Sequence, residues 1–160
     1  MAYTVDDELH SQSEWSPGVV NNNEVLLRTV FEPEHVVDEM VIEAAIPLSD
    51  LRSRGFSVDR SEYANKSIIH GRINRQISQL PEKRHSGLIS KFDCLSVRVL
   101  LDESERAFIV IDTADEENIA HASIYSAIER RDSALRRIRS LLLPCPVSYT
   151  HLTLPTSDLV

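Results

Sequence analysis

The chain has 160 residues, of which 42% are hydrophobic and 26% charged, and its formal net charge is −8 at pH 7. This length and composition fit one globular domain and exclude a wholly disordered chain. No apolar run approaches the roughly 20 residues of a membrane-spanning helix, and the acidic start lacks the features of a secretory signal. Two cysteines, Cys94 and Cys145, are too few for a disulfide framework or a four-cysteine zinc site. We therefore expect a cytoplasmic, bacterial-type protein that is not associated with a membrane.

Residues 1–23 are polar and acidic, and they end in two turn-forming stretches, Ser16-Pro17-Gly18 and Asn21-Asn22-Asn23. Such a segment buries too little apolar area to offset the entropy lost on ordering. We expect it to form a disordered acidic tail. Trp15 has two interpretations, either a side chain lying on the domain surface or a short anchor for a partner protein.

The first elements of the domain follow from Glu24 onward. Residues 25–31 are rich in β-branched and apolar residues and predict a strand that Pro33 terminates. Residues 36–48 are compatible with either a strand or a short helix. Residues 49–55 predict one helical turn stopped by a glycine, and residues 56–60 predict a short strand.

A helix is expected from about Ser61 to Leu80. Asp59 and Glu62 are three residues apart and resemble a helix-capping pair. The apolar residues of this stretch repeat at helical spacing and lie on one stripe, and Pro81 ends the pattern. The stripe consists of Ile69, Ile73, Ile77 and Leu80.

The second half predicts a hairpin followed by a long helix. Residues 95–101 alternate between apolar and polar types, residues 102–105 are polar, and residues 107–112 are apolar on both faces. The last of these strands is therefore expected at the centre of the sheet. A helix is expected over about residues 116–143. Its proposed buried stripe is Ile124, Ile128, Leu135, Ile138 and Leu142.

This order of elements predicts the α+β class. Residues 24–146 are expected to form a single α+β domain in which a mixed or antiparallel sheet packs with two longer helices. No internal repeat interrupts it.

The end of the chain resembles a translated nucleotide sequence rather than a protein segment. Residues 147–156 read VSYTHLTLPT, which is similar to one reading frame of the transposon-end adapter used in tagmentation sequencing libraries. Residues 157–160 then correspond to an index and flanking adapter. The alternative is an ordinary Thr- and Leu-rich edge strand. The resemblance implies that residues 147–160 carry no function and that the domain is a truncated fragment of a metagenomic sequence.

Several kinds of site have no motif in the sequence. The four glycines are scattered, so there is neither a Gly-rich phosphate loop nor a dinucleotide fingerprint. His35, Asp38 and Glu39 have the spacing of metal ligands on a helix, but such groups are common in an acidic chain. We expect no metal and no cofactor.

The stretch of residues 111–122 combines polar groups where a strand is expected to end. Asn118 and His121 are three residues apart and would share a helix face. A carboxylate such as Asp112 near an imidazole could orient a general base. In the alternative interpretation, Asp115 or Asn118 caps the helix and His121 fills a gap under the sheet.

Three segments together resemble a family of small uncharacterised bacterial proteins. They are Leu27-Arg28-Thr29-Val30, Phe56-Ser57-Val58-Asp59-Arg60 and Asn118-Ile119-Ala120-His121-Ala122. Members of that family carry a serine-valine strand midway and an Asn-x-Ala-His-Ala segment near the end. The resemblance covers residues 24–125 and implies no specific activity. The positions it nominates as a ligand-binding site are Arg28, Ser57, Arg60, Asn118 and His121.

A second resemblance is to the cleft of ADP-ribosyltransferases, in which an Arg and a Ser on neighbouring strands hold NAD. Arg28 and Ser57 match these two positions. The family's third-strand Glu-x-Glu motif is absent, although Glu103 and Glu105 form a spaced pair in an expected turn. The resemblance implies a nucleotide-using transferase in which His121 or a glutamate assists.

The end of the last expected helix is rich in arginine. These residues are Arg130, Arg131, Arg136, Arg137 and Arg139. They either form a solvated face paired with the acidic remainder of the domain, or they contact RNA or an acidic protein. The net charge disfavours nonspecific nucleic-acid binding.

The leading interpretation is an accessory or binding domain that contacts a protein or a small ligand. The nucleotide-using transferase and a nucleic-acid-binding domain are the alternatives, and whether the chain is an enzyme stays open.

Overall fold

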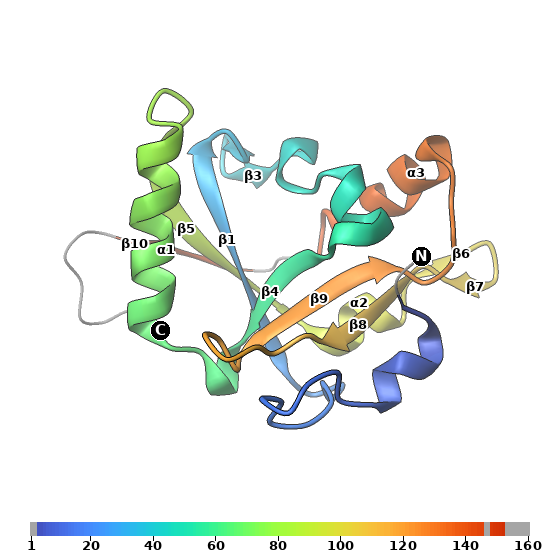
Figure 1. Ribbon diagram of the computed structural model, residues 1–160. Helices are drawn as coiled ribbons and strands as arrows, with labels where there is room; N and C mark the ends of the chain where they lie inside the picture. Colours follow the sequence, from blue (N-terminus) through green and yellow to red (C-terminus); the bar gives the residue numbers. More distant parts are fainter. Residues whose placement is uncertain (1–2, 146–147, 153–160) are drawn as a thin grey trace.

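The computed structural model describes residues 3–145 and 148–152 and shows a single α+β domain (Figure 1). Its centre is a six-stranded antiparallel sheet with the strand order β10-β5-β1-β4-β9-β8. The strands are β1 (Val25–Pro33), β4 (Phe56–Arg60), β5 (Arg84–Asp93), β8 (Phe108–Asp112), β9 (His121–Ser126) and β10 (Ser148–Leu152). The predicted strands over residues 25–31, 56–60 and 107–112 are confirmed to within two residues.

The helix α1 (Lys66–Gln79) covers one face of the sheet. Ile69 and Ile73 on this helix pack against Leu27, Phe31 and Ile89 of the sheet. The predicted helix is therefore present, but it begins later than the capping pattern indicated. A short 3₁₀ turn, η4 (Ser61–Tyr63), comes first, and Asn65 caps α1 by accepting a hydrogen bond from the Ile68 amide at 3.1 Å.

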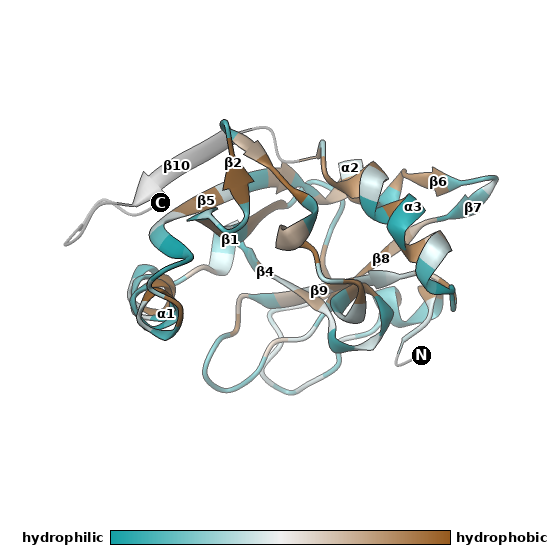
Figure 2. Cartoon of the chain, turned by 90° about the horizontal axis from the view of Figure 1, so that it is seen from above, coloured by the Kyte–Doolittle hydropathy of each residue, from teal (hydrophilic) through white to brown (hydrophobic). Residues whose placement is uncertain are grey.

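The opposite face carries the larger part of the core, under α2 (Cys94–Arg98) and α3 (Asp132–Leu142). In the view of Figure 2, these two helices lie well apart from α1. Leu135, Ile138 and Leu142 are the buried stripe of α3. The free cysteine Cys94 is part of this core, and burial raises the pKa of its thiol to about 11.

A run of short elements connects β1 to β4. The hairpin of β2 (Val36–Val37) and β3 (Met40–Val41) is followed by the 3₁₀ turn η2 (Glu43–Ala45), so the ambiguous stretch contains both strand and helical turn. The turn η3 (Asp50–Arg54) then ends at Gly55, as predicted. Gly55 has a φ of 91°, a conformation that glycine adopts without a steric penalty.

Two elements of the second half differ from the sequence-based expectation. Residues 94–98 form α2, and only the small hairpin of β6 (Leu101–Asp102) and β7 (Glu105–Arg106) follows. The prediction of one long helix over residues 116–143 is wrong. Residues 113–120 form a loop, β9 follows, and α3 is limited to residues 132–142. β9 is almost entirely buried within the sheet. Ile124 lies in β9 and Ile128 lies in the bend that follows it, so their helical spacing is a coincidence.

β5 and β8 also depart from the expectation. β5 has no counterpart among the expected elements, because polar residues such as Ser90 and Lys91 interrupt its apolar pattern. β8 is buried throughout and apolar up to its last residue, Asp112, but it lies at the edge of the sheet rather than at its centre. Its free edge is covered by side chains from other segments. The Val110 amide donates to Glu8 at 2.9 Å, and Arg98 donates to the Val110 carbonyl at 3.0 Å.

Residues 3–23 are packed against the domain, in contrast to the disordered tail expected for residues 1–23. We call this segment the N-terminal strap. It begins with the 3₁₀ helix η1 (Val5–Leu9), whose Glu8 forms ion pairs with Arg98 and Arg106. Val20 is also buried in the core, whereas Trp15 lies exposed on the surface. The strap is ordered through buried charge pairs, which a criterion based on apolar content does not register.

At the other edge of the sheet, β10 pairs with β5 from Ser148 to Leu152. This pairing uses main-chain groups, which any extended segment can supply. Residues 146–147 and 153–160, which include most of the expected adapter sequence, lie outside the described residues. In the described part of the chain, no helix has the length and apolar character needed to cross a membrane.

Candidate functional site

The candidate site lies where β1 and β4 separate. The two strands pair only at Leu26–Arg60 and Leu27–Asp59, after which β1 continues alongside β5 and β4 alongside β9. Figure 1 shows the strands diverging beneath η3. Arg28 is the first residue of β1 beyond the paired region. Its Nη1 donates to the Ser57 carbonyl at 2.8 Å and therefore bridges the two strands where their ladder has ended.

A cleft of about 490 Å³ opens over this fork, and we call it the fork cleft. α1 forms one wall, and the segment from η2 to η3 forms the other. Its polar lining consists of Arg28, Thr29, Glu34, His35, Asp50, Arg54, Ser57, Asp59, Arg72, Gln76, Gln79, Arg84 and His121. The volume is within the range of small-molecule sites.

Two groups of charges in the fork cleft are already neutralised. Asp59 is buried and forms an ion pair with Arg72. Glu34 accepts from Arg84 Nε at 3.0 Å and contacts His35 Nε2 at 2.9 Å. These residues hold the walls together.

His35 is a neutral member of this arrangement. Its Nδ1 accepts a hydrogen bond from the Phe31 amide at 3.1 Å, which leaves Nε2 as the protonated nitrogen that faces Glu34. Burial lowers the pKa of His35, although the Glu34 carboxylate acts in the opposite direction. The imidazole therefore serves to fix the loop that follows β1.

Arg28 is a cation without a direct counter-ion. Within residues 3–145, no carboxylate forms an ion pair with it, and its buried Nε has no hydrogen-bond partner. Its guanidinium lies over the Phe56 ring at 4.2 Å from the centroid. Burial lowers the pKa of Arg28 to about 10, and the more distant carboxylates Asp50 and Asp59 oppose this shift. Buried charges in proteins are normally paired, so Arg28 is an exception that needs an explanation.

Asp50 is the complementary exception. Its side chain is only 17% exposed, and the nearest cation is Arg54, whose Nε lies 4.0 Å from Oδ1 and whose side chain is 76% exposed. Burial raises the pKa of Asp50, while Arg28 and Arg54 act to lower it. The fork cleft thus holds a weakly paired anion, Asp50, near a cation, Arg28, that has no counter-ion among the described residues.

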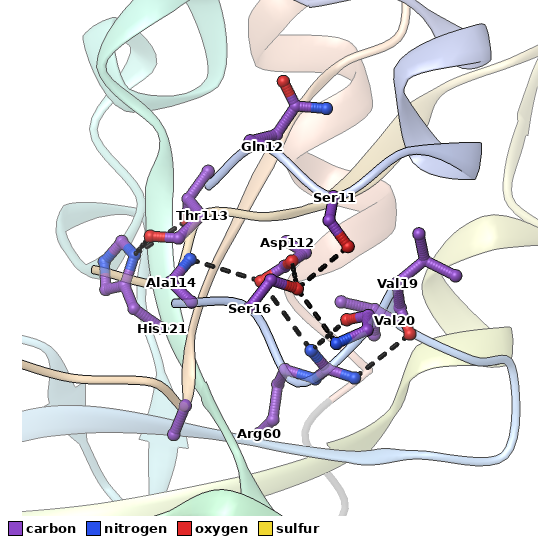
Figure 3. A network of polar contacts seen from close by, with 12 residues as sticks. Ser11, Gln12, Ser16, Val19, Val20, Arg60, Asp112, Thr113, Ala114 and His121 are labelled. Carbon is purple, nitrogen blue, oxygen red and sulfur yellow. Dashed lines mark hydrogen bonds and ion pairs between the residues drawn. The ribbon is translucent and has the colours of Figure 1, made fainter. Parts of the chain in front are cut away.

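His121 also lines the fork cleft, opposite Asp59 in the pairing of β4 with β9. Its Nδ1 lies 2.7 Å from Thr113 Oγ1, and that hydroxyl lies 2.8 Å from Ser123 Oγ. Figure 3 shows this contact beside the network that holds the N-terminal strap. The imidazole is therefore fixed in orientation by the end of β8.

The structure brings together three of the five residues nominated from the sequence. Arg28, Ser57 and His121 line the fork cleft. Asn118 is in the loop before β9 and not on a helix. It donates a hydrogen bond to Asp59 Oδ1 at 2.9 Å and so helps to fix the Asp59 side chain, which lines the cleft.

Arg60 does not line the fork cleft. Its guanidinium donates twice to Glu24, with both distances 2.7 Å, and it also contacts the Gly18 carbonyl at 2.6 Å (Figure 3 shows its surroundings). Asp112 is part of the same buried network, 3.7 Å from Arg60 and bonded to Ser16. Arg60 and Asp112 therefore anchor the N-terminal strap.

Six charged residues of the fork cleft were not nominated from the sequence: Glu34, Asp50, Arg54, Asp59, Arg72 and Arg84. Asp59 could have been found, because it is two residues after Ser57 in a predicted strand and must share its face. Arg72 and Asp50 come from separate elements, and their proximity depends on tertiary packing.

Most of the arginine-rich segment is paired within the domain. Arg130 and Arg137 both bind Asp102, at 3.2 and 2.8 Å, and Arg139 binds Glu43 at 3.1 Å. The two remaining members, Arg131 and Arg136, are exposed. This arrangement matches the solvated, internally paired face that was one of the two interpretations.

The spaced glutamates of the ADP-ribosyltransferase resemblance are not in the fork cleft. Glu103 and Glu105 belong to the β6–β7 hairpin, where they line a separate hollow beside α3. Among the residues described, no group of three or more His, Cys, Asp or Glu side chains is placed to hold a metal ion.

Comparisons of the chain with family models, curated proteins and solved structures found no match. The resemblance to small bacterial proteins remains a prediction. The function must accordingly be argued from the chemistry of the fork cleft.

Proposed function

We propose that the chain is a binding domain for a small anionic ligand, which it holds in the fork cleft with Arg28 as the anchor. The observation that carries this proposal is the state of Arg28, a half-buried guanidinium that lines the cleft and that, within residues 3–145, has neither an ion pair nor a partner for its Nε. An anion in the cleft would supply the missing counter-charge.

An anionic ligand would compensate for the hydration that the Arg28 guanidinium loses in the folded domain. Removing a charge from water costs several kcal/mol unless a counter-ion or strong hydrogen bonds replace the lost hydration. The contacts of Arg28 within the domain, one carbonyl and one aromatic face, are weaker than a bidentate contact with a carboxylate or phosphate. A ligand that makes such a contact offsets the desolvation free energy of Arg28, which the contacts within the free protein offset only in part.

The other arginines that line the cleft also favour an anionic ligand. Arg54 lines the cleft with its side chain mostly exposed, and four arginines line the cleft against three carboxylates. Because the domain as a whole is acidic, this local concentration of arginines favours a small anion over an extended polyanion.

The test is a thermal-shift and calorimetric screen of the whole chain against inorganic phosphate, sulfate and a set of small carboxylates. An anion that binds the native state stabilises it, by about 2.7 kcal/mol at a concentration 100 times the Kd. Arg28→Met should abolish the stabilisation, whereas Arg136→Met, a change at an exposed arginine of α3, should retain it. A stabilisation that survives Arg28→Met, or no stabilisation by any anion, contradicts the proposal.

The nucleotide-using transferase is a second candidate, favoured by the presence of His121 in the same cleft as Arg28 and Ser57. An imidazole fixed by Thr113 has the orientation that a general base needs. Incubation of the chain with NAD should then release nicotinamide, and His121→Gln should abolish this release without abolishing anion binding. The cytoplasmic, bacterial origin expected from the sequence stays a prediction.

A further inference from the structure

We propose that the ligand of the fork cleft is a zwitterion of the acidic amino acid class, with two carboxylates and one ammonium group. In this assignment Arg28 and Arg54 receive the carboxylates, and Asp50 receives the ammonium. The inference rests on the proposed function, because it specifies the ligand of the same cleft.

The charged side chains that line the cleft differ in how well they are paired. Asp59 is paired with Arg72, and Glu34 is paired with Arg84. These pairs are part of the walls and have no unmet demand for a counter-ion. The charges that remain are two cations, Arg28 and Arg54, and one anion, Asp50. The net charge of this set is positive, whereas a dicarboxylate with one ammonium group has a net negative charge.

Asp50 is the anion of this set. Its carboxylate is largely buried, yet within residues 3–145 its only ion pair is a 4.0 Å contact with Arg54. At that distance Nε and Oδ1 are too far apart for a hydrogen bond, so the carboxylate keeps unused acceptor capacity. A simple anion entering the cleft would be repelled by Asp50. An ammonium group on the ligand removes this repulsion and satisfies the carboxylate.

Neutral polar side chains also line the cleft. Gln76 and Gln79 lie on the α1 wall, and Thr29 and Ser57 lie at the fork. These side chains offer hydrogen-bond donors and acceptors rather than apolar surface. A compact polar molecule fits this lining better than one with a large apolar group, and the volume of about 490 Å³ leaves room for ordered water as well.

The experiment compares three probes that differ by one group each. Calorimetric titration of the whole chain with L-glutamate, glutarate and L-glutamine separates the roles of the ammonium and the second carboxylate. L-Glutamate should bind at least tenfold more tightly than either glutarate or L-glutamine.

A near-isosteric variant tests the role of Asp50. In Asp50→Asn, the preference for L-glutamate over glutarate should fall to within about twofold, because the ammonium loses its carboxylate partner. Glu105→Gln, which removes an exposed acid on the β6–β7 hairpin, is the matched control and should keep the full preference. Far-ultraviolet circular dichroism and the urea midpoint of each variant verify that it is folded.

The outcomes separate this inference from the proposed function. If glutarate and L-glutamate bind equally to the unmodified chain and both are lost in Arg28→Met, the anion site stands and the zwitterion assignment is wrong. If phosphate binds but neither glutamate nor glutarate does, the assignment is also wrong. If none of the anions binds, both proposals fail.

Discussion

Two arginines on adjacent strands show how the same residue type serves two purposes. Arg60 is almost fully buried and has a complete set of partners, including the Glu24 carboxylate and main-chain carbonyls of the N-terminal strap. Arg28 is half-buried, and among the residues that the structure describes it has one carbonyl partner and an unpartnered Nε. A protein optimised for stability alone would not retain the second arrangement.

This contrast predicts that the same substitution destabilises the domain much more at Arg60 than at Arg28. Arg60→Met leaves Glu24 buried without its partner and should lower the free energy of unfolding by about 3–5 kcal/mol. Arg28→Met removes a poorly compensated charge, which offsets the lost hydrogen bond to Ser57, and should lower it by no more than about 1 kcal/mol. Urea denaturation measures both values. Equal destabilisation by the two substitutions would show that Arg28 is a structural residue like Arg60.

At the scale of elements, the sequence predicted the parts that have regular patterns. β1, β4, β8 and α1 follow from runs of β-branched residues or from a helical stripe, and the structure contains all of them. The same rules failed where burial overrides periodicity. β9 is buried on both faces and therefore has no alternation of apolar and polar residues. The spacing between its apolar residues and those of α3 matches a helical repeat by coincidence, which led to the prediction of one long helix.

The site was predictable to the extent that it depends on strands. Arg28 and Ser57 were nominated on neighbouring strands, and His121 was nominated as well, although in a helix. Asp50 and Arg72 could not be nominated, because nothing in a single sequence indicates that η3 and α1 face each other across a fork. The fork itself arises from the limited pairing of β1 with β4, which is a property of the sheet and not of either strand.

Two glycines provide a test of how η3 is positioned. Gly55 ends η3 with a φ of 91°, and a Cβ at this position would lie 2.9 Å from both Ser123 Cβ and Tyr125 Oη. Gly55→Ala should therefore destabilise the domain by about 1–3 kcal/mol and weaken ligand binding through displacement of Asp50.

The matched control is Gly71, which is in the interior of α1 with no atom near the position of an added Cβ. Gly71→Ala should stabilise the domain by about 0.5–1 kcal/mol, because alanine loses less backbone entropy in a helix. Urea midpoints of the two variants check both signs. A tolerated Gly55→Ala would mean that η3 is not fixed by this close approach.

At the scale of the whole molecule, the N-terminal strap closes an edge that the sheet would otherwise expose. Glu8 supplies an acceptor to the Val110 amide of β8, and Arg98 and Arg106 neutralise its charge. Asp112, at the end of the same strand, holds Ser16 of the strap. Edge strands with free main-chain groups promote unwanted pairing between molecules, and the strap prevents it here.

The strap also predicts a specific pH dependence. Hydrogen bonds from Arg106, Val110 and Arg98 hold the pKa of Glu8 below its ordinary value of 4.5, despite the opposing and largest effect of burial. A carboxyl group whose folded pKa is lowered contributes stability that is fully present above its unfolded pKa and is lost as the pH falls through the folded pKa. The contribution of Glu8 should therefore be complete at pH 7 and decline below about pH 4.5.

Glu8→Gln measures this contribution. The variant should be less stable than the unmodified chain by about 3 kcal/mol at pH 7, because two arginines lose their counter-ion, and the difference should narrow as the pH falls below 4.5. Glu14→Gln, at an exposed position of the same strap, should have no such effect. A stability difference for Glu8→Gln that does not change with pH would contradict the assignment.

The central claim, that Arg28 binds an anion in the fork cleft, is tested most directly by nuclear magnetic resonance of the arginine side chains. The Nε–H resonance of Arg28 can be assigned by its disappearance in Arg28→Met and then followed during titration with L-glutamate and with phosphate. Anion binding by Arg28 should produce a saturable shift of this resonance that exceeds the shifts of exposed arginines such as Arg136. An Arg28 resonance that does not move, or equal small shifts of all arginines, would contradict it.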